Sequence, residues 1–234
     1  MILNDVSFDI KANEKLGLGG QSGSGKSMIA WSILGLAPRE AQISGQVVYS
    51  LGDRHVDLLN DNQAKAVLGS EVAIIPQNPY TSLNPSIRCG QQISRDHKPR
   101  VLEILQELGL EDPDRIYDSF PHQLSGGQLQ RVVMAMAMIS EPKLLIADEP
   151  ATALDTTTKA DVIKHLNAWC TRHNSAMLVI SHDLQVLNQL CRTFRTVTQG
   201  TVGERLDAPG STKPVSEEQS RMSVKSETGM LLAV

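Results

Sequence analysis

The sequence has few of the features that mark secreted, disulfide-stabilised or membrane-spanning proteins. Only three cysteines occur among its 234 residues, and none forms a CxxC pair. Scattered cysteines in an odd number favour a reducing compartment and argue against a thiolate zinc or iron–sulfur site. The longest apolar run, 132–139, is far short of the about 18 residues that a membrane span needs. We therefore expect any membrane role to depend on a partner subunit.

The first residues show no signal-peptide pattern, and the net charge is small. The first residues, MILNDVSFDIKANEK, contain acids throughout and no apolar central segment, so they do not resemble a signal peptide. The formal net charge of −4 gives the chain no bulk electrostatic reason to bind nucleic acid or anionic lipid. With 41% hydrophobic residues, the chain has the composition of a globular domain that can bury a core without disulfides.

Short apolar runs separated by turn residues predict strands along much of the chain. We expect them at 6–10, 16–20, 46–49, 56–59, 72–75, 144–147 and 177–180. Asn13 is suited to a tight turn between the first two, and Gly52 with Asp53 to a hairpin between the next two. Strands that alternate with helices indicate an α/β fold with a parallel sheet.

Helical spacing of apolar residues is found in three places. Around 80–142 it predicts a helical subdomain, in which Gly109 caps a helix at its C-terminus. Another helix follows residue 27, and a third lies between the strands at 144–147 and 177–180. The expected apolar faces are Val101, Ile104, Leu105 and Leu108; then Ile29, Ile33 and Leu36; then Val162, Ile163, Leu166 and Trp169.

Residues 20–27 read GQSGSGKS and lie between an expected strand and an expected helix. This is the GxxxxGK[ST] phosphate loop in the context that it requires. Glycines at 20, 23 and 25 let backbone N–H groups turn toward phosphates, and the helix N-terminus favours the same anions. Lys26 then reaches the β- and γ-phosphates, and Ser27 offers its hydroxyl to Mg²⁺.

Two further segments carry groups that suit phosphate chemistry. The run LLIADE, residues 144–149, predicts a buried strand that delivers two carboxylates at its end. Asp148 would hold Mg²⁺ through its water shell, and Glu149 would orient and deprotonate an attacking water. Residues 124–131, LSGGQLQR, open a helix whose first N–H groups form a second anion site. Two such surfaces make most sense if two chains meet head to tail.

These motifs, in this order and spacing, resemble the ATP-binding cassette (ABC) family of transport ATPases up to about residue 207. The resemblance implies an α/β P-loop NTPase fold of ABC type, with a mixed, mostly parallel sheet, an antiparallel β region and an inserted helical subdomain. It assigns 1–79 and 143–207 to the core and 80–142 to the helical signature subdomain. The polar composition of 208–234 predicts a disordered tail.

The resemblance also implies which residues contact nucleotide and metal. Glu149 and His182, in VISHDL, are implied to be catalytic, with His182 contacting the γ-phosphate. Asp155, in TALD, is implied to cross the seam between two cassettes. Mg²⁺ is implied to be held by Ser27, Gln77 and Asp148. The implied nucleotide contacts are Gly20, Ser22, Gly23, Ser24, Gly25, Lys26, Ser27, Met28, Gln77, Ser125, Gly126, Gly127, Gln128 and Asp155.

A finer resemblance lies in IIPQNPYTSLNP, residues 74–85, and in FPHQLSGGQLQR, residues 120–131. Both look like the branch that serves oligopeptide, dipeptide and nickel importers. This branch implies ATP and Mg²⁺ as cofactors, two transmembrane permease subunits and a second ATPase subunit, identical or related. It also implies an extracytoplasmic substrate-binding protein that acts indirectly, no nucleic acid, and a peripheral position on the cytoplasmic face of the inner membrane.

Two other functions stay open. A soluble cassette ATPase that acts on nucleic acid or ribosomes usually carries coiled-coil or second-cassette insertions, which this sequence lacks. A regulatory cassette would bind nucleotide without turnover. Its support is that the family's adenine-stacking aromatic would lie upstream of residue 1, although the residues implied in hydrolysis are all present.

Five histidines take no part in these motifs. They lie at positions 55, 97, 122, 165 and 173 and show no metal-ligand spacing. We expect them to be surface groups.

Overall fold

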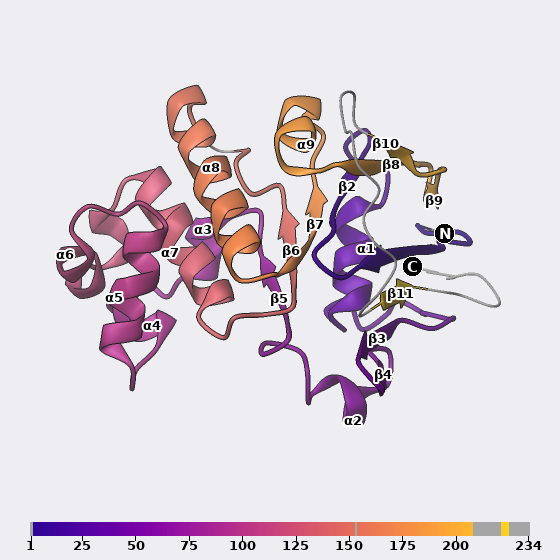
Figure 1. Ribbon diagram of the computed structural model, residues 1–234, viewed down its shortest axis with the longest axis horizontal. Helices are drawn as coiled ribbons and strands as arrows, with labels where there is room; N and C mark the ends of the chain where they lie inside the picture. Colours follow the sequence, from indigo (N-terminus) through magenta and orange to yellow (C-terminus); the bar gives the residue numbers. More distant parts are fainter. Residues whose placement is uncertain (1, 153, 208–220, 225–234) are drawn as a thin grey trace. The chain divides into compact units, whose positions relative to one another are not determined.

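The computed structural model describes residues 2–152, 154–207 and 221–224, which form two compact units (Figure 1). The first unit takes in the described parts of Met1–Leu68 and Ala176–Val234, and the second is Gly69–Ser175. In chain order, the second unit is therefore a continuous insertion into the first. The α/β class with a mixed, mostly parallel set of strands is confirmed.

The first unit contains a parallel group of strands and a separate antiparallel sheet. In the parallel group, β2 (Lys15–Gly19) lies between β7 (Ala176–Ile180) and β8 (Thr193–Thr198). The short strands β9 (Thr201–Val202) and β10 (Leu206–Asp207) pair antiparallel with β8. The antiparallel sheet has the order β1–β11–β3–β4, formed by Phe8–Lys11, Arg221–Val224, Val48–Leu51 and Arg54–Asp57.

Buried apolar side chains explain these strands. All five residues of β7 are buried, as expected of a parallel strand that is covered on both faces. Helix α9 (Leu184–Leu190) packs on β2, where a Cβ added at Gly17 would lie 3.0 Å from Leu187 Cδ2. Helix α1 (Lys26–Ile33) buries Ile29 and Ile33, and the short α2 spans Asp61–Ala64.

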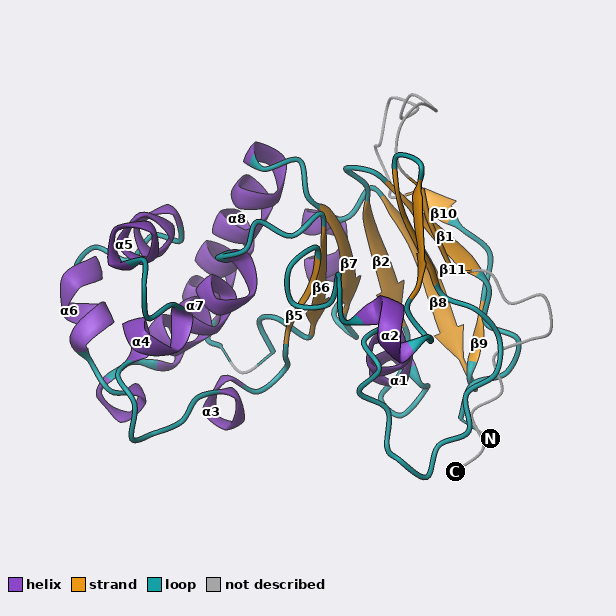
Figure 2. Cartoon of the chain, turned by 90° about the horizontal axis from the view of Figure 1, so that it is seen from below, coloured by secondary structure: helices purple, strands orange, loops and turns teal. Residues whose placement is uncertain are grey.

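The second unit contains two paired parallel strands and several helices (Figure 2). Strand β5 (Val72–Ile75) lies beside β6 (Leu144–Asp148), and α8 (Thr156–Arg172) follows β6 in the chain. The expected helical region lies between the two strands in sequence. It consists of α3 (Pro79–Ser82), α4 (Cys89–Ile93), α5 (Lys98–Glu107), α6 (Pro113–Asp118), the 3₁₀ turn Pro121–Gln123 and α7 (Gly126–Met138).

Two glycines shape these helices: one ends a helix and the other lets two helices pack closely. Gly109 has a φ of 75° after the end of α5, so the predicted C-terminal cap is confirmed. In α4, a Cβ added at Gly90 would lie 2.0 Å from Cδ2 of Tyr117 in α6, which shows that only glycine fits there. Helices α4 and α6 therefore pack with an aromatic ring directly over backbone.

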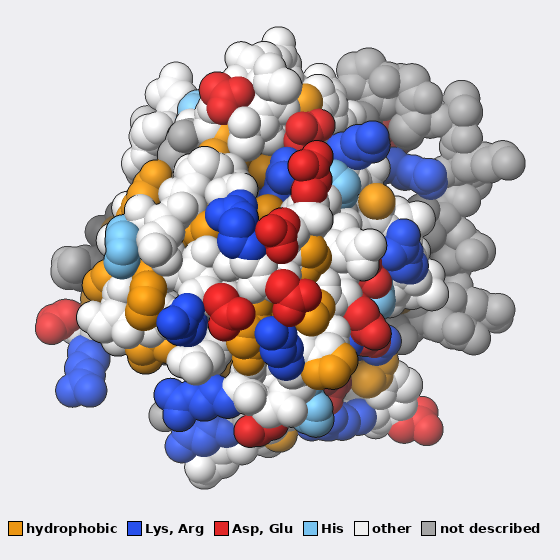
Figure 3. Space-filling view, turned by 90° about the vertical axis from the view of Figure 1, so that its left-hand side faces the viewer, with side chains coloured by type: hydrophobic (Ala, Val, Ile, Leu, Met, Phe, Trp, Pro, Cys, Tyr) orange, Lys and Arg blue, Asp and Glu red, His pale blue; other side chains and the backbone are white. Residues whose placement is uncertain are grey.

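Acidic and basic side chains alternate on the face of the second unit around α5 and α6. Figure 3 shows this face, on which blue and red side chains are interleaved instead of being separated by sign. Lys98 pairs with Asp114 at 3.0 Å and its Nζ lies 4.7 Å from the ring centre of Tyr117. Hydrogen bonding to Asp114 raises the pKa of Lys98 above its ordinary value. The face thus has no uniform charge.

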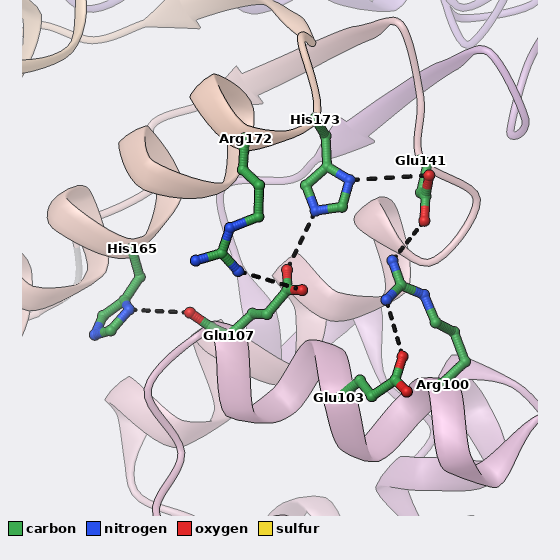
Figure 4. Close-up of polar contacts among 7 residues, drawn as sticks. All are labelled: Arg100, Glu103, Glu107, Glu141, His165, Arg172 and His173. Atoms are coloured by element: carbon green, nitrogen blue, oxygen red, sulfur yellow. Dashed lines mark hydrogen bonds and ion pairs between the residues drawn. The ribbon is translucent and has the colours of Figure 1, made fainter.

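A polar network links α5, Glu141 in the loop after α7, and the C-terminal end of α8 (Figure 4). Glu107 accepts from His173 at 3.3 Å and lies 3.4 Å from Arg172. Arg100 joins Glu103 and Glu141 at 3.1 and 2.6 Å. The ring of His173 also stacks on Trp169, with centroids 4.4 Å apart.

Two of the five remaining histidines are therefore not simple surface groups. His173 keeps only 15% of its side chain exposed, and His165 contacts the carbonyl oxygen of Glu107 at 3.1 Å. The prediction was wrong for these two because it considered metal ligation alone. It holds for His55, His97 and His122, which are exposed.

The structure differs from the sequence analysis in two other places. Helix α1 ends at Ile33, and Leu36 follows a turn at Gly35 (φ 65°) and is 61% exposed instead of lying on the buried face. Residues 221–224, within the stretch assigned to a disordered tail, form β11 between β1 and β3. Backbone pairing on both sides explains a strand that composition did not indicate. The rest of 208–234 lies outside the described residues.

Candidate functional site

The loop between β2 and α1 wraps around its own lysine. Gly20, Gly23 and Gly25 have positive φ angles of 145°, 79° and 104°, which other residue types rarely adopt. The Nζ of Lys26 donates hydrogen bonds to the carbonyl oxygens of Gly20 and Gln21, both at 2.8 Å. Lys26 is only 6% exposed, so its charge is held against backbone carbonyls. The expected order of strand, glycine loop and helix is confirmed.

The donors of this loop suit a phosphate chain. The hydroxyl oxygen of Ser24 is buried and has no hydrogen-bond partner among the described residues. A Cβ added at Gly20 would lie 2.4 Å from the carbonyl oxygen of Val197, so the turn requires glycine. Backbone N–H groups, a helix N-terminus and an ammonium group are the donors that bind phosphate in proteins. Ser22 lies exposed on the same loop, and Ser27 and Met28 begin α1.

His182 lies near the start of this loop within the first unit. Strands β2 and β7 pair in parallel with Leu18 opposite Ile180, and the backbone N–H of Ser181 donates to the carbonyl oxygen of Leu18 at 3.2 Å. The carboxyl ends of the two strands therefore meet at one edge. Gly20 and His182 follow at that edge, and the His182 side chain is exposed.

The second unit collects its acids at one edge in the same way. Ile75 of β5 pairs with Ala147 of β6, so Gln77 and the pair Asp148 and Glu149 follow the same ends of two parallel strands. Asp148 and Glu149 are 3% and 7% exposed. Glu149 has a φ of 50°, a conformation that costs about 1–3 kcal/mol for a residue other than glycine. The Glu149 carboxylate is thus positioned by a strained backbone conformation.

The segment Ser125–Gln128 forms a complete capping box. The hydroxyl of Ser125 accepts from the N–H of Gln128 at 3.3 Å, and the Gln128 side chain accepts from the N–H of Ser125 at 3.1 Å. The first N–H groups of a helix have no partner within the helix, so those of Gly126 and Gly127 have no acceptor within α7. A Cβ added at Gly126 would lie 3.5 Å from the hydroxyl oxygen of the exposed Tyr80.

Asp155 caps the N-terminus of helix α8 in the same unit. Its Oδ1 accepts from the N–H groups of Thr157 and Thr158, both at 3.1 Å. Hydrogen bonding, first from the side chain of Thr158, lowers the pKa of Asp155 below its ordinary value. The carboxylate is therefore charged and oriented at the start of α8.

Comparison with known proteins shows which family has this combination of motifs. Residues 3–152 match the model of a family described as ABC transporter, and this stretch is more than half of the chain. The chain belongs to the ABC transporter family. The expectation drawn from the motifs at 20–27, 125–128 and 148–149 is confirmed at the level of the family.

Relatives of this ABC protein are found among transport ATP-binding proteins. It is 35% identical to the oligopeptide transport ATP-binding protein OppD of Lactococcus lactis subsp. cremoris, over 86% of this chain and 62% of that protein. It is 36% identical to the dipeptide transport ATP-binding protein DppD of Escherichia coli, over 87% of this chain and 65% of that protein. The chain thus spans less than two thirds of the length of these relatives.

A solved ABC structure has the same fold. The dimeric ATP-binding cassette MJ0796 in a post-hydrolysis state, bound to ADP and Pi, matches with a TM-score of 0.74 and 26% identity. The match covers 90% of this chain and 92% of that one. Among the described residues of this ABC protein, no helix is long and apolar enough to cross a membrane.

Sequence reasoning missed the threonines that hold the acids of this ABC protein. The hydroxyl of Thr152 donates to Oε2 of Glu149, and Thr158 hydrogen-bonds Asp155. Both lie three residues after the acid that they contact. A hydroxyl at that spacing, in a turn or at a helix start, is the signal that would have revealed them.

Proposed function

We propose that this chain is the ATP-binding and ATP-hydrolysing subunit of an importer for peptides or metal chelates. The observation that carries the proposal is the glycine loop that holds Lys26 at the N-terminus of α1. The names of the relatives add the substrate class, because they include oligopeptide and dipeptide transport proteins and the metal-staphylopine import protein CntD of Staphylococcus aureus. Peptides and metal chelates thus have more support than nickel itself.

Lys26 binds and orients the phosphates in this proposal. Its ammonium group donates to two loop carbonyls, and it exchanges these for the β- and γ-phosphate oxygens when ATP binds. The loop N–H groups and the buried hydroxyl of Ser24 supply further donors. This cradle binds ATP mainly through its phosphates.

Hydrolysis requires a base and charge neutralisation. Glu149 takes the proton of the attacking water, and Thr152 fixes the direction of its carboxylate. Ser27, Gln77 and Asp148 carry oxygen donors of the kind that Mg²⁺ prefers. A Mg²⁺ ion held by these residues would supply positive charge that offsets the negative charge developing on the phosphates. His182 contacts the γ-phosphate.

A second cassette completes each site. Ser125–Gln128 presents the first N–H groups of α7 to the γ-phosphate held by the partner, and Asp155 lies at the seam between the two chains. Closure of the dimer around ATP moves two membrane permease subunits, and hydrolysis reopens it. The chain then works as a peripheral subunit on the cytoplasmic face of the inner membrane, with a substrate-binding protein acting from the other side.

ATP turnover by the purified chain tests the catalytic part. We expect Glu149→Gln to lose about 100-fold or more in kcat while it accumulates a dimer with ATP, seen by light scattering. Ser125→Arg should abolish turnover and leave ATP binding by its own loop intact. Normal turnover by Glu149→Gln would contradict the assignment of the base, and normal turnover by Ser125→Arg would contradict head-to-tail sharing.

Co-purification tests the transport part separately. The tagged chain, expressed in its native cells, is isolated from gently solubilised membranes and its partners are identified by mass spectrometry. We expect two multi-span subunits and a second cassette. Recovery of only soluble or ribosomal partners would overturn the importer proposal and leave the ATPase assignment standing.

A further inference from the structure

Helices α7 and α8 approach each other closely at Gly127 and Thr158. A Cβ added at Gly127 would lie 2.3 Å from Cγ2 of Thr158, a distance that real Cβ contacts essentially never show. The methyl group of Thr158 therefore lies directly over the backbone of the first turn of α7. Gly127 belongs to the capping-box segment Ser125–Gln128.

The other branch of the same side chain holds Asp155. The Thr158 hydroxyl is hydrogen-bonded to the Asp155 carboxylate, which also accepts from the Thr158 N–H at 3.1 Å. A β-branched side chain has few χ1 choices, and its hydroxyl and methyl directions are fixed relative to each other. Holding the hydroxyl on Asp155 thus fixes where the methyl meets Gly127.

We propose that Thr158 is a positioning residue that ties the orientation of Asp155 to that of the segment Ser125–Gln128 in the same chain. A movement of either group is passed to the other through one stiff side chain. This inference rests on the proposed function, in which both groups face a neighbouring cassette. It adds a connection between them within one subunit.

Two conservative substitutions separate the two branches. Thr158→Val keeps the methyl contact with Gly127 and removes the hydroxyl, whereas Thr158→Ser keeps the hydroxyl and removes the methyl. We expect either change to lower kcat about five- to tenfold, in line with the loss of one interaction, with the KM for ATP unchanged because the phosphate loop is not touched. Thr156→Val, an exposed neighbour at the start of α8, is the matched control and should behave as wild type.

The pKa of Asp155, followed by carboxyl ¹³C NMR, reports the hydroxyl branch without any need for turnover. It should rise toward its ordinary value in Thr158→Val and stay lowered in Thr158→Ser. An unchanged pKa of Asp155 in Thr158→Val would overturn the proposal. It would also be overturned if kcat and KM changed together, in parallel with the melting temperature, because that is the behaviour of a residue with a purely structural role.

The methyl branch is tested by compensation. Gly127→Ala should lose most of its turnover and lower the melting temperature, because its Cβ meets Thr158 Cγ2. Adding Thr158→Ser removes that atom and leaves the remaining Thr158 atoms at 3.6 and 3.8 Å, so both properties should recover in part. A double variant no better than Gly127→Ala would overturn the proposal. Absence of turnover in the wild type would instead refute the proposed function. The pKa and melting-temperature measurements would still show whether Thr158 links Asp155 to Gly127.

Discussion

The hydroxyl of Thr152 donates a hydrogen bond to Oε2 of Glu149, three residues before it in the chain. Glu149 is nearly buried and has a left-handed backbone conformation, so its carboxylate is constrained from both the backbone and the side chain. Constraint of this kind is what a general base requires, since its oxygen must meet a water in one orientation.

Loss of the Thr152 hydroxyl should therefore slow hydrolysis without weakening ATP binding. We expect Thr152→Val to lower kcat about five- to tenfold, much less than Glu149→Gln, with KM unchanged. Steady-state kinetics measure both constants. Thr171→Val removes a comparable hydroxyl from the last turn of α8 and should have no effect. A fall in kcat for the control of the same size would show that the effect is not specific to Glu149.

Removal of the Lys26 ammonium group should greatly reduce the stabilisation that ATP gives to the protein. Bound ligand stabilises the folded state in proportion to the logarithm of its concentration over Kd. We expect Lys26→Ala to raise Kd at least about tenfold and to remove most of the ATP-dependent rise in melting temperature. Lys143→Ala, at an exposed position, should retain the full shift. An ATP-dependent rise in Lys26→Ala equal to that of the wild type would contradict the role of the lysine.

The network around Glu107 should contribute to the stability of the second unit. Glu107 has 20% of its side chain exposed and pairs with Arg172 and His173, so Glu107→Gln should cost about 1–2 kcal/mol of unfolding free energy. Glu103→Gln is the control: it changes a carboxylate of the same helix that is 63% exposed, and we expect about 0.5 kcal/mol or less. Urea denaturation measures both, and equal losses would mean that the partners of Glu107 are unimportant.

Gly90→Ala should destabilise the protein by overpacking. The new methyl group would lie 2.0 Å from the Tyr117 ring, which must move together with α6, at a cost of about 1–3 kcal/mol. Gly203→Ala places its methyl at an ordinary 3.4 Å from the carbonyl oxygen of Thr196 and should cost less. Thermal unfolding compares the two. A melting temperature for Gly90→Ala equal to that of the wild type would show that the helices α4 and α6 adjust without strain.

The Cys89 thiol should react slowly while the protein is folded. Burial raises the pKa of Cys89 from 9.0 to about 11, so its thiolate fraction near pH 8 falls about 100-fold. Burial also raises the pKa of Cys191. Alkylation by iodoacetamide, followed by mass spectrometry, should label neither residue until denaturant is added. Rapid labelling of the native protein would contradict this burial.

Local patterns predicted the parts of the site that depend on adjacent residues. The phosphate loop could be found because Gly20, Gly23, Gly25 and Lys26 lie close together in one short segment of the sequence. The capping box of Ser125 and Gln128 is likewise a property of four consecutive residues. The geometry of such motifs is determined by the conformation of a few neighbouring residues, so the sequence is enough to predict it.

Contacts made by distant segments could not be predicted in this way. The role of Thr158 depends on how closely α8 approaches Gly127, and that of His173 on where Glu107 and Glu141 lie. Strand β11 depends on two partner strands far away in sequence. The exposure of Leu36 follows from where α1 stops, which periodicity does not define.

The place of β11 in its sheet has a consequence for the order in which a ribosome releases the chain. Its neighbours β1 and β3 emerge first, yet they flank β11 and do not pair with each other. All of Gly69–Ser175 is synthesised before β11, and domains generally fold as units during synthesis. During translation, we therefore expect the second unit to fold before the antiparallel sheet of the first unit is complete.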